Sequence, residues 1–168
     1  MSMGAVIAYF ERQTFNDALV FLEIANNLEE SKTFERWRYF MWTIIAAQTF
    51  AEAYLKSFVL SKLSAQALEI FNDTHPTFKI LLSRYIKKVL KLTIENGDSD
   101  WKDVTDILEL RNKIMHHQLP DATFDSLTPD NAQKAIRACR TLVKRLHQAD
   151  GTSCPTWIDN QTPEQYDK

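Results

Sequence analysis

The sequence predicts an all-α protein, an up-and-down bundle of four long helices with one or two short helices. The chain has 168 residues, which fits one domain with a substantial hydrophobic core. It contains three glycines and has long stretches without proline, which argues against a turn-rich β architecture. Apolar residues recur three and four positions apart, the spacing of an amphipathic helix. Together these observations favour a helical bundle.

The second of the first two predicted long helices is expected to be the centre of the structure. The first lies within residues 4–30, and Thr14 is an alternative N-cap for a helix that begins at Phe15. The second spans about 34–63, with Thr33 as N-cap, and is apolar around most of its circumference. At a rise of about 1.5 Å per residue it would be roughly 40–45 Å long, more than a small domain needs. We therefore expect a second subunit to bury part of it.

The middle of the chain predicts one short and two longer helices. The short helix covers 65–71 and leads to the turn 72–76, in which a histidine precedes a proline. A long helix over 77–93 follows and ends at a segment rich in turn-forming residues. Asp100 is predicted to cap the next helix, which runs from 101 to about 118.

The last helix has clear start and stop signals. Thr128 and Pro129 pair an N-cap residue with a proline at the first helical position, and Gly151 is a typical C-terminal signal. The residues beyond are polar and include two prolines. We therefore expect a helical domain over 1–150 and a polar tail over 151–168.

Composition and motif searches narrow the classes of function. The formal net charge of -2 does not indicate nucleic acid, and Cys139 and Cys154 belong to no metal-binding cysteine cluster. No apolar run reaches membrane length, and the apolar segment 1–10 has no basic region before it. HExxH, Glu-x-x-His and glycine-rich phosphate-loop patterns are absent. We expect a cytoplasmic protein that has no membrane association, no metal and no cofactor.

The strongest chemical candidates lie in one segment near the end of the fourth long helix, residues 111–117. Arg111 can hold an anion, and a histidine can move a proton near neutral pH. Asn112 and His116 share a helix face, whereas Arg111 lies about 140° from His116 and must curl toward that face. His116 and His117 lie in the last turn, where the helix dipole favours imidazolium, and either could be the reactive one. The alternative is an exposed helix end whose basic residues cap free carbonyls.

Glu52 is a second candidate, on the central apolar helix. It belongs to a narrow polar stripe with Gln48, Thr49 and Lys56. A carboxylate there could face a pocket and orient Arg111 or a histidine. The alternative is a weak surface ion pair between Glu52 and Lys56, four residues apart.

Basic residues are concentrated in two stretches that lack acidic residues, one on each of two helices. This segregation can create a positive groove for phosphates if both helices flank Arg111. The alternative is a pair of solvated helix faces. The candidate RNA-binding residues are Arg84, Lys87, Lys88, Lys91, Arg137, Arg140 and Lys144.

These features resemble the HEPN domain family. Arg111, Asn112, three further residues and His116 fit its Arg-polar-x-x-x-His signature. The segment 51–56 resembles the family's Glu-x-x-x-Lys segment, and 74–78 resembles the turn that opens its third helix. The likeness covers roughly residues 15–149.

The resemblance implies a HEPN-like bundle that forms a homodimer, in which the motifs of both subunits meet in a shared cleft. Many members are metal-independent endoribonucleases of toxin–antitoxin, defence and RNA-processing systems. By this analogy His116 would be the general acid/base, Arg111 would hold the scissile phosphate, Asn112 would orient the motif and Glu52 would position Arg111. The implied partners are RNA, a second copy of the chain, and an antitoxin or a nucleotidyltransferase-type protein.

One departure from the family pattern concerns regulation. Members silenced by a nucleotidyltransferase carry a tyrosine two residues after the histidine, where this chain has Gln118. This difference argues against that mode of silencing. A second hypothesis is a non-catalytic HEPN-like module that binds a nucleotide or a protein, and a third is a helical regulator unrelated to the family.

Overall fold

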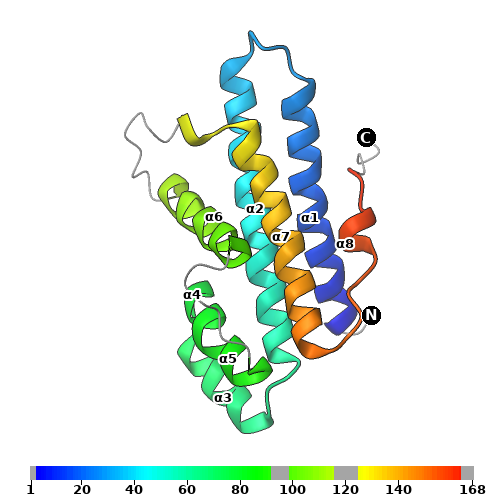
Figure 1. Ribbon diagram of the computed structural model, residues 1–168, viewed down its shortest axis with the longest axis vertical. Helices are drawn as coiled ribbons and strands as arrows, with labels where there is room; N and C mark the ends of the chain where they lie inside the picture. The colour runs from blue at the N-terminus through cyan, green and yellow to red at the C-terminus, as the bar shows by residue number, and fades with distance from the viewer. Residues whose placement is uncertain (1–2, 92–98, 116–124, 164–168) are drawn as a thin grey trace.

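The computed structural model describes residues 3–91, 99–115 and 125–163, and within these ranges it contains helices and no strand (Figure 1). The prediction of an all-helical protein is confirmed. The elements are α1 (Met3–Asn27), α2 (Thr33–Leu60), α3 (Ala65–Thr74), α4 (Phe78–Ile80), the π-helical turn η1 (Leu81–Tyr85), α5 (Ile86–Leu90), α6 (Ser99–Met115), α7 (Pro129–Asp150) and α8 (Trp157–Asn160).

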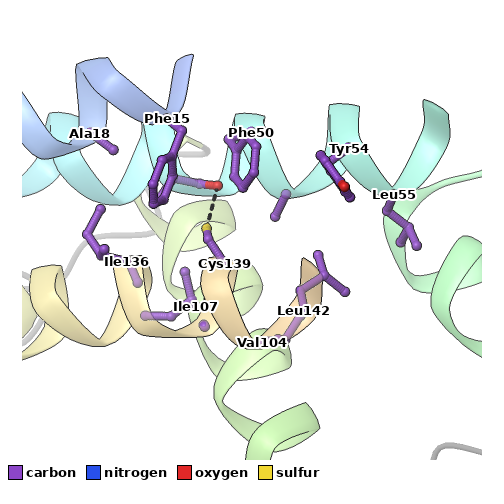
Figure 2. Close-up of a cluster of buried hydrophobic side chains, with 14 of the residues drawn as sticks. Phe15, Ala18, Phe50, Tyr54, Leu55, Val104, Ile107, Ile136, Cys139 and Leu142 are labelled. Atoms are coloured by element: carbon purple, nitrogen blue, oxygen red, sulfur yellow. Dashed lines mark hydrogen bonds between the residues drawn. The ribbon is translucent and has the colours of Figure 1, made fainter. Parts of the chain in front are cut away.

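Helix α2 is the centre of the bundle. It forms an antiparallel hairpin with α1, and α7, α6, η1 and α4 also pack against it (Figure 1). Ile44, Phe50 and Leu55 of α2 are fully buried, as expected for a helix that is apolar on nearly all sides. The Phe15 ring of α1 lies 4.9 Å from the Phe50 ring, between centroids. The Cys139 thiol of α7 donates a hydrogen bond to an α2 carbonyl at 3.0 Å (Figure 2).

Helix α7 begins and ends where the sequence predicts. The Thr128 side chain accepts a hydrogen bond from the backbone N–H of Asn131 at 3.2 Å, and Pro129 is the first helical residue. Gly151 ends the helix with φ +70°, a left-handed conformation that favours glycine. Both ends depend on neighbouring residues only, so their signals are readable in the sequence.

The helix predicted over 77–93 is present but is interrupted. Thr77 caps it, since its side chain accepts from the backbone N–H of Ile80 at 3.4 Å. The central turn 81–85 is π-helical, a wider turn that inserts one extra residue. The helix ends at Leu90 because Lys91 is left-handed, with φ +53°.

Three other predicted boundaries need correction. Helix α2 begins at Thr33 and Lys32 is its N-cap, so Thr33 is inside the helix, and its hydroxyl donates to the carbonyl of Glu30 at 3.2 Å. Helix α6 begins at Ser99, so Asp100 is its second residue rather than its cap. Helix α3 continues through Thr74, three residues beyond the predicted end.

The expectation of a polar tail after residue 150 also needs correction for the part up to residue 163. Ile158 of α8 is fully buried, and the Trp157 ring lies 6.0 Å from the rings of both Phe15 and Phe50. Gln161 is also buried and accepts a hydrogen bond from Arg12 Nε at 2.9 Å. These apolar contacts hold the segment against α1 and α2.

Within the described residues, no helix is long and apolar enough to cross a membrane.

Candidate functional site

A hollow of about 990 Å³ lies between α2, the turn before α4, η1, α5 and α6. It brings Glu52 of α2 together with Arg111 and Asn112 of α6, three residues that the sequence singles out. Lys87 of α5 and His75 of the turn also line it. We call this hollow the Arg111 pocket.

The amphipathic pattern of α6 sets which side chains face the pocket. One face of the helix packs into the core, in the cluster that also holds Cys139 and Leu142 of α7 (Figure 2). The buried side chains of this face are Trp101, Val104, Ile107 and Ile114. The pocket is lined from α6 by Trp101, Thr105, Leu108, Glu109, Arg111 and Asn112.

Arg111 is held by its neighbour in the sequence. Its Nη1 donates a hydrogen bond to Asn112 Oδ1 at 3.1 Å. Its Nε is buried and has no hydrogen-bond partner among the described residues. A buried donor left unpaired is costly, so this guanidinium has unused capacity for an anion in the pocket.

Glu52 lines the pocket but does not position Arg111 in this structure. Its side chain is exposed, and within the described part of the chain it forms an ion pair with neither Arg111 nor Lys56. The positioning role expected for Glu52 therefore needs correction: Asn112 contacts the guanidinium instead. The alternative of a Glu52–Lys56 surface pair is not formed either.

The two histidines of the motif, His116 and His117, lie outside the described residues. Helix α6 is described up to Met115, whose side chain is 47% exposed. The expected role of either histidine stays a prediction.

His75 is a pocket residue that the sequence did not indicate. It ends α3 in a left-handed conformation, with φ 42°, and lines the same hollow as Arg111. A histidine before a proline reads locally as part of a turn, which accounts for the omission. Only in the folded chain does this turn line the same hollow as α2 and α6, which places His75 near the arginine.

The basic residues of the third helical segment divide between two hollows. Lys87 lines the Arg111 pocket. Arg84 and Lys88 line a separate hollow of about 240 Å³. Lys91 is exposed just beyond α5.

The basic residues of α7 are directed elsewhere. Arg140 Nε donates to the carbonyl of Ile158 at 2.9 Å, and Lys144 pairs with Asp159 at 2.7 Å, so both contact α8. Arg137 is exposed. The described lining of the Arg111 pocket includes no residue of α7. The condition for one shared basic groove, that both helices flank Arg111, is not met.

Comparisons with protein-family models, with curated proteins and with solved structures found no significant match for this chain. Among the described residues, no three His, Cys, Asp or Glu side chains are grouped so that they could hold a metal ion.

Proposed function

We propose that this protein is a metal-independent endoribonuclease of HEPN type, with an active site shared across a homodimer. The observation that carries the proposal is the Arg111 guanidinium, which bonds to Asn112 and has a buried N–H without a partner among the described residues. It lies in a hollow of about 990 Å³, a volume that suits a nucleotide-sized ligand. Lys87 of α5 adds positive charge to the lining of the same hollow.

The reaction is an attack of the ribose 2′-oxygen on the adjacent phosphorus. The bond from phosphorus to the 5′-oxygen breaks, which leaves a 2′,3′-cyclic phosphate and a 5′-hydroxyl. Arg111 donates hydrogen bonds to the phosphate oxygens as negative charge develops on them. His116 removes the proton of the 2′-hydroxyl or delivers one to the leaving oxygen, and His117 is the alternative for this role. Two motifs in a dimer would supply both an acid and a base.

Single substitutions test this proposal on a labelled RNA in the presence of EDTA. We expect Arg111→Ala and His116→Ala each to lower the cleavage rate by on the order of 100-fold or more, since each removes one transition-state interaction. Lys113→Ala is a matched control, because Lys113 is exposed on the same helix. His117→Ala identifies which histidine reacts.

Cleavage that survives both substitutions in folded protein, or that disappears with EDTA, would contradict the proposal. Circular dichroism establishes that each variant is folded. The end groups of the products provide an independent check, since a 2′,3′-cyclic phosphate is expected.

A non-catalytic nucleotide-binding module is the second candidate, and the same unpaired N–H of Arg111 favours it. Equilibrium binding of nucleoside monophosphates separates the two candidates. The binding module is the correct candidate if the wild type binds a nucleoside monophosphate but cleaves no RNA. Arg111→Ala should then abolish that binding. An antitoxin or nucleotidyltransferase-type partner remains part of the ribonuclease proposal.

A further inference from the structure

A second hollow, of about 320 Å³, lies on the other side of α2. Glu52 faces the Arg111 pocket and Tyr54 faces this second hollow, and two residues along a helix correspond to about 200° of rotation. Glu11 of α1 lines it, together with residues at and just beyond the C-terminal ends of α2 and α7. We call it the Glu11 pocket, after the α1 residue on its wall.

A chain of hydrogen bonds runs along one wall of the Glu11 pocket and ends in an ion pair. Tyr54 Oη lies 2.7 Å from His147 Nε2, and His147 Nδ1 lies 2.8 Å from Thr152 Oγ1. The Thr152 hydroxyl donates to Asp150 Oδ2 at 3.0 Å, and Lys62 Nζ pairs with the same oxygen at 2.6 Å.

The direction of this chain follows from its last bond. Because the Thr152 hydroxyl donates to Asp150, its oxygen accepts from Nδ1–H of His147. A neutral imidazole protonated on Nδ1 has a bare Nε2, which accepts from the Tyr54 hydroxyl. Burial lowers the pKa of His147, in agreement with the neutral form. The Tyr54 hydroxyl therefore donates its proton to His147 Nε2, and its oxygen can still accept a hydrogen bond.

Glu11 is the pocket residue whose charge this network does not neutralise. Its side chain is 6% exposed, and its Oε1 has no hydrogen-bond partner among the described residues. A side-chain hydrogen bond with Ser57 engages the carboxyl group, and burial raises its pKa. The cation of this pocket, Lys62, is paired with Asp150 instead. Within the described part of the chain, the Glu11 carboxyl group therefore has no cationic partner in this pocket.

The pocket thus offers acceptors and an aromatic surface, and its ammonium group, that of Lys62, is already paired with Asp150. Glu11 Oε1 and Tyr54 Oη can accept hydrogen bonds, and Phe58 lies on the same wall. The Lys62 ammonium already rests 5.4 Å from the centroid of the Phe58 ring, a distance at which rings attract cations. An anionic ligand would meet the carboxyl groups of Glu11 and Asp150, and the Lys62 ammonium that could attract it already pairs with Asp150. A ligand with both a positive charge and N–H donors suits the carboxyl group, the acceptor oxygens and the aromatic ring of this pocket.

We propose that the Glu11 pocket binds a small primary alkylammonium group, which pairs with Glu11 Oε1 and donates to Tyr54 Oη. The volume of about 320 Å³ limits the ligand to a small amine or to the end of a longer one, such as a lysine side chain. The proposal is independent of the ribonuclease proposal, because the two pockets share no lining residue.

Isothermal titration with n-butylammonium chloride at pH 8 tests the proposal, and n-butanol is the matched neutral ligand. We expect saturable binding of the ammonium and binding of the alcohol that is weaker by about tenfold or more. Putrescine and lysine capped at both ends then distinguish a free amine from one carried by a protein.

Variants of the full chain assign the site. Glu11→Gln keeps the shape of the side chain and removes its charge, so we expect affinity for n-butylammonium to fall by about tenfold or more. Tyr54→Phe removes one acceptor and should weaken binding by a smaller factor. Glu69→Gln, on the exposed surface of α3, and Arg111→Ala should leave the affinity unchanged. Absence of binding to folded wild type, or equal affinity in Glu11→Gln, would overturn the proposal.

Discussion

Arg111 and Glu11 are unusual residues in this protein, because each is a charged side chain with a buried polar atom that lacks a partner among the described residues. Arg111 has an unused donor on one side of α2, and Glu11 has an unused acceptor on the other. Folded proteins pair nearly all such atoms, because leaving one unpaired costs roughly 1–3 kcal/mol. Residues of this kind indicate where a ligand supplies the missing partner.

Glu11 also predicts a dependence of stability on pH. Burial raises its pKa above the ordinary value of 4.5, so the folded protein holds this proton more tightly than the unfolded chain does. The contribution of Glu11 to stability is thus greatest below the unfolded pKa and declines as pH rises through the folded pKa. The side chain in Glu11→Gln is neutral at every pH. We therefore expect the unfolding free energy of this variant, relative to that of the wild type, to increase from pH 4.5 to pH 8.

Urea unfolding of both proteins at several pH values measures this difference. The charged neighbours Lys62, His147 and Asp150 are present in both proteins, so their own titrations cancel to first order. A difference that stays constant over this range would contradict the assignment of a raised pKa to Glu11.

At the level of elements, local signals predicted α7 well and α8 not at all. The caps at Thr128 and Gly151 are fixed by adjacent residues, so a single sequence is sufficient to locate them. Helix α8 has four residues, and its position depends on the burial of Ile158. The π-helical turn 81–85 also has no local signal. Such features follow from packing partners that are distant in the sequence.

The packing of α8 can be measured through Ile158. The side chain is fully buried, so we expect Ile158→Ala to lower the unfolding free energy by about 2–4 kcal/mol through lost burial and a cavity. Thr156→Ala is a nearby control, because Thr156 is exposed and its side chain makes no capping hydrogen bond. Equal unfolding free energies for the two variants would show that α8 contributes little to stability.

At the level of the whole molecule, the helical period and the composition were sufficient to predict the class of fold. The expectation that Glu52 lies near Arg111 came from the resemblance to HEPN domains rather than from the helical period, and both residues line the Arg111 pocket. The direction of the α7 basic residues could not be predicted, since it depends on how that helix rolls against α2 and on the presence of α8. His75 was missed for a similar reason, because its turn reaches the pocket only in the folded chain.

The proposed homodimer is a prediction about the assembly. Phe34, in the first turn of α2, and Trp42, further along the same helix, are 65% and 44% exposed. The α1–α2 hairpin extends beyond the start of α7 (Figure 1). Large exposed aromatic side chains are typical of interfaces. Light scattering should give twice the chain mass of 19.5 kDa, and Phe34→Ser with Trp42→Ser should shift the protein toward monomer. A strict monomer at micromolar concentration would contradict the shared active site.

The hydrogen bond between Cys139 and α2 has a practical consequence. Cys139 is 2% exposed, its thiol donates to the carbonyl of Ala47, and burial raises its pKa. Because alkylating reagents react with the thiolate, this cysteine is protected until α7 separates from α2. Cys154 is partly exposed and can be replaced by serine. The rate at which Cys139 is then alkylated would report how often the bundle opens in native buffer, without denaturant.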